Sequence, residues 1–156
     1  MSSFPEVGAK APAFSLTRDG GGTVSLKDFK GRKLVVYFYP KADTPGCTKE
    51  AIAFNGLKAE FAAADTDILG VSADEVKAQD KFRDKYSLGF ALGSDPETKM
   101  AKDWRVWVQK SLYGREYMGL ERATFLVNAT GTIEAAWHKV KVPGHVEAVL
   151  EAAQSL

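Results

Sequence analysis

Apolar residues along the 156-residue chain fall into runs and helical stripes that follow one another in sequence. A continuous apolar run over residues 34–39 has the length and composition of a buried strand. Apolar positions then recur at helical spacing and predict a helix that begins at Pro45; they are Ala51, Phe54, Leu57 and Phe61. An apolar run over residues 67–72 and a helical segment over 74–86 complete a β-α-β-α order.

Two pairs of segments have the pattern of β-hairpins. Residues 13–17 and 23–26 flank a glycine-rich turn at 18–22, which lacks the Lys-Ser/Thr ending and the following helix of a phosphate-binding loop. Residues 123–128 and 132–137 flank a short turn and are expected to pair antiparallel.

The remaining segments are shorter. We expect a strand at residues 90–92, a helix over 96–103 opened by Asp95, and a last helix over 145–153. Residues 105–120 are rich in aromatic side chains and are expected to be irregular. Alternating strands and helices, followed by a hairpin and a helix, predict an α/β fold with a mixed central sheet flanked by helices on both faces.

Composition supports one compact domain over residues 1–156, since 45% of the residues are hydrophobic and 26% are charged. The formal net charge of +1 gives no field that would gather nucleic acid or a membrane surface. Residues 1–6 lack the order of a signal peptide, and no apolar run approaches the roughly 20 residues of a membrane span. We therefore expect a cytoplasmic protein.

Cysteine usage narrows the chemistry. The single cysteine excludes an internal disulfide and is typical of a reducing compartment. With only two histidines beside it, no Cys/His metal site is expected, and no cofactor is implied.

Cys47 follows the first buried strand within the segment Pro-Lys-Ala-Asp-Thr-Pro-Gly-Cys. Thr44 is expected to be the N-cap and Pro45 the first helical residue, which places Cys47 in the first turn of a helix. Unpaired N–H groups and the positive end of the helix dipole favour the nucleophilic thiolate there. The alternative is an inert buried cysteine, but the Thr-Pro-Gly-Cys context favours a reactive one.

These residues resemble the peroxiredoxins, and within them the branch of bacterioferritin comigratory protein, also called PrxQ. Pro40, Thr44 and Cys47 match the family's Pro-x-x-x-Thr-x-x-Cys motif, and Arg122 and residues 139–145 match further segments. The resemblance covers nearly the whole chain. It implies a thioredoxin-like fold with an N-terminal β-hairpin extension, and reduction of hydrogen peroxide and small organic hydroperoxides by Cys47.

The chain departs from many members of this branch at Ile52, where the resemblance implies a resolving cysteine. Other members place that cysteine in the helix that corresponds to residues 74–86, which also contains none. A sulfenic acid on Cys47 must then be reduced by a thiol from another molecule, such as thioredoxin, glutaredoxin or glutathione. This predicts a one-cysteine peroxidase that acts as a monomer or a homodimer.

The resemblance also assigns Pro40, Thr44 and Arg122 to the pocket around Cys47. We expect Thr44 to offer its hydroxyl to the sulfur or the peroxide, and Pro40 to shield the thiolate from water without adding a donor. Arg122 would supply a fixed positive charge with forked N–H groups. Positioning of the peroxide and stabilisation of the leaving oxygen should matter more than the abundance of thiolate.

Two supporting residues lie beside the nucleophile in sequence. Gly46 is expected to keep the approach open, and its N–H and that of Cys47 lie at a helix start, where an anion is favoured. Glu50, one turn along the helix, is expected to orient Arg122, although a solvated helix residue is an equal alternative.

A thiol–disulfide oxidoreductase normally uses Cys-x-x-Cys, but Thr44 occupies the first of those positions. A redox sensor or chaperone-like module stays open as an additional role. His138 and His145 are expected to be structural. An aromatic-rich group is expected to form core or pocket wall, with a partner-binding surface as the less favoured alternative: Trp104, Trp107, Tyr113, Tyr117 and Met118.

Overall fold

A computed structural model describes residues 6–156, so the first five residues, part of the segment without a signal-peptide pattern, lie outside the described residues. The main sheet has seven strands in the order β2-β1-β5-β4-β3-β8-β9. They are β1 (Ser15–Arg18), β2 (Thr23–Ser25), β3 (Lys33–Phe38), β4 (Thr66–Ser72), β5 (Ala91–Ser94), β8 (Ala123–Val127) and β9 (Ile133–His138). Because β3 pairs in parallel with β4 and antiparallel with β8, the sheet is mixed, as predicted.

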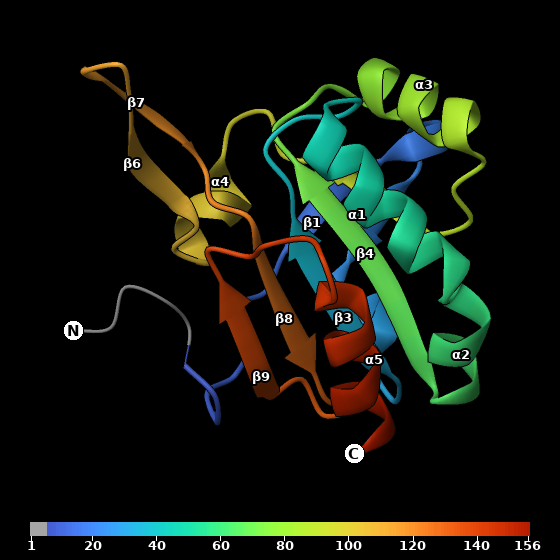
Figure 1. Ribbon diagram of the computed structural model, residues 1–156. Coiled ribbons are helices and arrows are strands. Elements are labelled where there is room, and N and C mark those ends of the chain that lie inside the picture. The colour runs from blue at the N-terminus through green and yellow to red at the C-terminus, as the bar shows by residue number, and fades with distance from the viewer. Residues whose placement is uncertain (1–5) are drawn as a thin grey trace.

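Helices cover both faces of this sheet, which confirms the predicted layering (Figure 1). They are α1 (Pro45–Gly56), α2 (Lys58–Ala63), α3 (Val76–Tyr86), α4 (Lys99–Asp103) and α5 (His145–Gln154), with short 3-10 turns η1 (Asp19–Gly21) and η2 (Leu26–Phe29). Side chains of α1, α2, α3 and α5 share one core cluster, whereas α4 belongs to the other. No helix within residues 6–156 is long and apolar enough to cross a membrane.

Strand β3 lies at the centre and contributes to both cores. Its side chains alternate between the faces, so Val35 and Tyr37 pack under α1 while Val36 and Phe38 pack against the opposite cluster. All four are fully buried, which explains why this strand reads as a continuous apolar run. The end of β3 is therefore firmly packed, and the segment that contains Cys47 begins directly after it.

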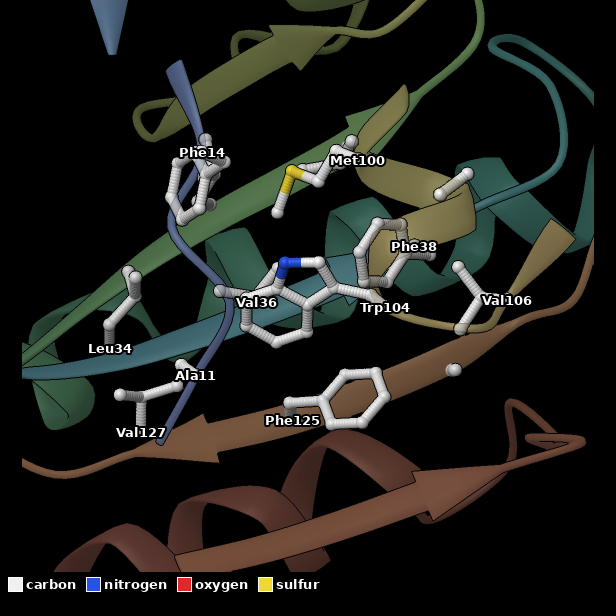
Figure 2. Packing of buried hydrophobic residues seen from close by; sticks show 14 of the residues in the cluster. Ala11, Phe14, Leu34, Val36, Phe38, Met100, Trp104, Val106, Phe125 and Val127 are labelled. Carbon is white, nitrogen blue, oxygen red and sulfur yellow. The ribbon is translucent and has the colours of Figure 1, made fainter. Parts of the chain in front are cut away.

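Trp104 fills the core on the face away from α1, as Figure 2 shows. Its ring centroid lies 5.0 Å from that of Phe125, 5.8 Å from that of Phe38 and 6.3 Å from that of Phe14. The indole is fully buried, and its Nε1 has no hydrogen-bond partner among residues 6–156. The expectation of a core position is thus right for this member of the aromatic group.

The expectation of an irregular segment over residues 105–120 is wrong. The chain forms a regular antiparallel hairpin of β6 (Trp107–Leu112) and β7 (Arg115–Leu120). Tyr113 and Gly114 form its two-residue turn, both with positive φ, which is the backbone of the tight turns that match strand twist. The hairpin is mostly exposed, so it lacks the apolar alternation by which a half-buried strand is recognised.

Exposure also corrects the expectation for three aromatic-group members. The side chain of Tyr113 is almost completely exposed, and those of Tyr117 and Met118 are about half exposed. These residues lie on β6–β7 or its turn, away from the core. They are therefore surface residues and not core.

Two helices differ in detail from their predictions. The single helix expected to reach Phe61 is broken at Leu57 into α1 and α2. The short helix expected over residues 96–103 begins only at Lys99, with Thr98 as its N-cap, so its predicted start is wrong. The carboxylate of Asp95 nevertheless accepts hydrogen bonds from the N–H groups of Met100 at 3.3 Å and Ala101 at 2.9 Å, in the first turn of this helix.

We predict that Trp104→Ala lowers the free energy of unfolding by about 3–5 kcal/mol, because it leaves a large cavity among three aromatic rings. Trp104→Phe should cost roughly 1–2 kcal/mol, since it keeps an aromatic ring and removes a buried N–H that has no partner. Urea unfolding followed by circular dichroism measures both. Equal losses for the two variants would contradict this account of the core.

Candidate active site

Cys47 lies in the first turn of α1. This helix follows β3 in the chain (Figure 1). Thr44 is the N-cap by its extended backbone, Pro45 is the first helical residue, and the N–H of Thr48 donates to Thr44 O at 2.8 Å to close the first turn. The side chain of Cys47 is 1% exposed. The sulfur is thus held in a shielded position at the end of a helix that favours negative charge.

Arg122 reaches this sulfur from a distant part of the chain. It directly precedes β8, and the pairing of Ala123 with Phe38 places it beside the end of β3. Its Nη2 donates to Sγ of Cys47 at 3.4 Å, and its backbone oxygen accepts a hydrogen bond from the N–H of Val140 at 3.0 Å. The guanidinium therefore provides a positive charge and a donor at the sulfur, as the sequence led us to expect.

Glu50 anchors the same guanidinium. Its Oε1 accepts a hydrogen bond from Nη1 of Arg122 at 2.8 Å, and its side chain is fully buried. Burial raises the pKa of Glu50 to about 7, although the charge and hydrogen bond of Arg122 oppose this shift. Burial lowers the pKa of Arg122, but the charges of Glu50 and Cys47 outweigh burial and raise it overall. This geometry matches the expected orienting contact and not a solvated helix residue.

Gly46 makes room for the guanidinium. A β-carbon at this position would lie 3.0 Å from Nη2 of Arg122, which is closer than side-chain carbons normally approach. The absent side chain was expected to open a path to the sulfur, and the structure shows that it also admits Arg122. Any larger residue would push the donor away from Cys47.

The hydroxyl of Thr44 has a different partner from the one expected. Oγ1 donates to the backbone oxygen of Lys41 at 2.8 Å and makes no capping bond to the helix. Its proton is therefore engaged within the loop, while its lone pairs can still accept a hydrogen bond. Pro40 is half-buried at the exit of β3, four residues before Thr44.

Contacts that the sequence did not indicate hold the loop before Cys47. Asp43 has a φ of +59° and accepts hydrogen bonds from Nζ of Lys85 at 3.0 Å and from the hydroxyl of Tyr86 at 2.8 Å. These two bonds lower the pKa of Asp43. Asp74 Oδ2 accepts the N–H of Ala42 at 2.8 Å. The loop is thus tethered to α3 and to the turn before it, through pairs too far apart in sequence for a local pattern to reveal.

His145 is the first residue of α5 and packs among residues of β8, β9 and α1. Its Nε2 lies 2.8 Å from Oγ1 of Thr124, and its ring stands edge-on to Phe54 and Trp137. Burial and the positive charge of Arg122 lower the pKa of His145 to about 4, so it is neutral at neutral pH. These contacts are those of a packed structural residue.

Within residues 6–156, no three His, Cys, Asp or Glu side chains form a group that could hold a metal ion.

Comparison with known proteins gives consistent matches. Residues 7–136 match the AhpC/TSA family. The chain is 48% identical over 145 residues to a putative peroxiredoxin Bcp of Coxiella burnetii, which covers 93% of this chain and 96% of that protein. It is 47% identical over 146 residues to the peroxiredoxin Bcp of Bacillus subtilis, which covers 94% and 93% respectively.

Solved structures show the same fold. A Xylella fastidiosa PrxQ variant superposes with a TM-score of 0.93 at 37% identity, over 99% of this chain and 98% of that one. Peroxiredoxin Q of Xanthomonas campestris superposes with a TM-score of 0.87 at 44% identity, over 91% and 90%. Taken with a buried cysteine at a helix start beside an arginine, these matches show that the chain belongs to the AhpC/TSA family, in its Bcp/PrxQ peroxiredoxin branch, and is a thiol-dependent peroxidase.

Proposed function

We propose that Cys47 is the residue that attacks the hydroperoxide and that Arg122, Thr44 and Pro40 complete its pocket. The observation that supports this most strongly is the contact of 3.4 Å between Nη2 of Arg122 and the buried sulfur. An arginine fixed at a thiol stabilises the thiolate and leaves N–H groups for an oxygen that gains negative charge. Glu50 and Gly46 support the site by holding and admitting this arginine.

In the oxidative step the thiolate of Cys47 attacks the terminal oxygen of the hydroperoxide. The S–O bond forms as the O–O bond breaks, and the leaving oxygen takes a proton to become an alcohol or water. Arg122 opposes the negative charge that moves from sulfur to oxygen during this step. The hydroxyl oxygen of Thr44 can accept a hydrogen bond from the O–H of the peroxide, because its own O–H already donates to Lys41 O.

The reductive step requires a second molecule, because Cys47 is the only cysteine in the chain. An external thiol displaces water from the sulfenic acid to form a mixed disulfide, and a second thiol releases Cys47. Ile52 is about half exposed on α1 and supplies no thiol. The Xanthomonas relative has been solved with two different cysteines replaced by serine, so it has at least one cysteine more than this chain.

We infer hydrogen peroxide and small organic hydroperoxides as substrates; a solved Xanthomonas relative is described by its alkyl peroxide reduction activity. Thioredoxin, glutaredoxin or glutathione would serve as reductant in a cytoplasmic protein, since thiols are kept reduced there. The near-neutral charge supports neither nucleic acid nor a membrane surface as partner. We propose a single domain over residues 1–156 that acts as a monomer or homodimer.

The test of this cycle is Cys47→Ser, which we expect to abolish peroxide consumption. A serine hydroxyl does not ionise near neutral pH, and no second thiol is present. Peroxide consumption is measured with thioredoxin, with glutaredoxin plus glutathione, and with a small dithiol, which also identifies the reductant. Circular dichroism checks the fold, and dimedone labelling after one equivalent of peroxide should mark Cys47 in the parent only. Turnover by the serine variant above the uncatalysed rate would disprove the assignment.

Arg122→Lys should lower the rate constant for peroxide reduction by about 10²–10³, although it keeps the charge. One guanidinium serves Cys47 and Glu50 through separate nitrogens, and a single ammonium cannot reproduce that fork. Stopped-flow kinetics with hydrogen peroxide measures the loss. Arg32→Lys is the matched control, because Arg32 bonds Asp67 at 3.0 Å near the opposite end of β3. A near-parental rate for Arg122→Lys would remove this residue from the mechanism.

Glu50 should make stability depend on pH in a defined direction. Its pKa is raised from 4.5 to about 7 in the folded protein. Between these two pH values, Glu50 is therefore protonated in the folded protein and ionised in the unfolded chain. This contribution is fully present below the unfolded value and is lost as pH rises toward 7, by up to about 3 kcal/mol. Urea unfolding between about pH 5 and about pH 8 should show this slope in the parent and not in Glu50→Gln. Parallel curves for the two proteins would rule it out.

A further inference from the structure

A cavity of about 260 Å³ lies near the start of β3, whereas Cys47 follows the end of that strand. Its lining includes Leu34 and Val127, which are cross-strand partners on β3 and β8 and are almost fully buried (Figure 2). Leu26 and Phe29 of η2 also line it and are only partly buried. The cavity therefore offers a ligand apolar side chains that belong to one hydrophobic core.

Backbone hydrogen bonds hold the walls of this cavity in place. The N–H of Gly31 donates to Ala129 O at 3.0 Å, which joins the loop after η2 to the turn between β8 and β9. The N–H of Gly131 donates to Asn128 O at 3.0 Å and closes that turn. Because the walls are already ordered, a ligand does not have to order the chain, which is a cost that weakens binding.

The neutral polar side chains of the wall are bonded within the turn. Oδ1 of Asn128 accepts hydrogen bonds from the N–H of Thr130 at 3.0 Å and from its hydroxyl at 2.8 Å. Nδ2 of Asn128 donates to Oε1 of Glu134 at 2.6 Å. The charged side chains of the lining are therefore the main groups left to recognise the polar end of a ligand.

All charged residues that line the cavity are cations, namely Lys27, Lys30 and Arg32. Arg32 already has a partner, since its Nε donates to Oδ2 of Asp67 at 3.0 Å. Within residues 6–156, the ammonium groups of Lys27 and Lys30 form no ion pair and no hydrogen bond. Asp28 lies between them in sequence, but its carboxylate accepts a backbone N–H at the start of η2 and is not part of the lining. Two free positive charges thus accompany an apolar cavity that contains no carboxylate.

An apolar cavity beside two free cations matches a small molecule that has an alkyl chain and one carboxylate. The volume of about 260 Å³ holds about nine groups the size of a water molecule, at about 30 Å³ each. This corresponds to a chain of about six to eight carbons, shorter than the acyl chains of membrane lipids. Two lysines alone would also attract an anionic membrane, but a concave apolar site favours a small ligand that can enter it.

We propose that this cavity binds a medium-chain carboxylate. The alkyl chain lies against Phe29, Leu34 and Val127, and the carboxylate is held by the ammonium groups of Lys27 and Lys30. The site is separate from the peroxidase site and makes or breaks no bond. Since its walls come from segments that meet only in the folded chain, the ligand binds the folded protein and stabilises it.

Octanoate, butanoate and 1-octanol separate the contribution of the alkyl chain from that of the charge. Binding to the full chain is measured by isothermal titration calorimetry and located by amide NMR shifts. The double variant Lys27→Met/Lys30→Met removes both charges and keeps most of each side-chain stem. The matched control is Lys77→Met/Lys81→Met, which removes two exposed lysines of α3, a helix that packs in the other core cluster.

Octanoate should bind the parent with a dissociation constant on the order of 0.1–1 mM, and shift amides within residues 26–34 and 127–131. Butanoate should bind at least about tenfold more weakly, because each buried methylene contributes about fourfold. Removal of Lys27 and Lys30 charge should weaken octanoate about three- to tenfold and leave 1-octanol within about twofold. The α3 control should bind both ligands as the parent does.

The proposal is overturned if octanoate shows no saturable binding, if the shifted amides lie elsewhere, or if the double lysine variant binds octanoate as tightly as the parent. Vesicles that contain phosphatidylglycerol test the membrane alternative. Vesicle binding that depends on these lysines and is not displaced by octanoate would identify a membrane-contact surface and would also overturn the proposal. Circular dichroism checks that each variant is folded.

Discussion

The guanidinium of Arg122 is the interaction on which the rest of the site depends, because its two ends join the sulfur of Cys47 to the carboxylate of Glu50. Both acceptors are buried on α1, so neither can turn to water for a substitute partner. The pairing of β3 with β8 brings Arg122 to this position, and Gly46 leaves room for its side chain. The same strand pairing thus builds the central sheet and places Arg122 beside Cys47.

Much of this arrangement could be predicted from sequence because its signals are local. The apolar run of β3 and the Thr-Pro start of α1 define the strand-to-helix turn within a dozen residues. The family resemblance then singled out Cys47 and Arg122 as candidates, although no local pattern connects two residues 75 positions apart. The pairing of β3 with β8 brings the two residues together, and the structure is needed to show that Ala123 lies opposite Phe38.

The features that the sequence did not predict, one hairpin and the contacts of two loop side chains, have no local signal in the sequence. The β6–β7 hairpin is exposed to solvent over much of its surface. It therefore lacks the alternation of apolar and polar residues by which a half-buried strand is recognised. Thr44 is the N-cap by its backbone, but its hydroxyl donates to the oxygen of Lys41 and forms no bond to the helix, which the sequence does not reveal. Asp43 binds partners more than forty positions away on α3, where neither composition nor spacing hints at contact.

This last contact changes how the loop before Cys47 relates to α3. The family resemblance implies that some members carry a resolving cysteine on the helix that corresponds to α3, where this chain has none. Here the same two elements are linked by the carboxylate of Asp43 with Lys85 and Tyr86, groups that neither gain nor lose electrons. A disulfide forms only when two thiols are oxidised, whereas an ion pair and a hydrogen bond need no change in the oxidation state of the sulfur. In this chain the loop before Cys47 is therefore joined to α3 by contacts that do not depend on a second thiol.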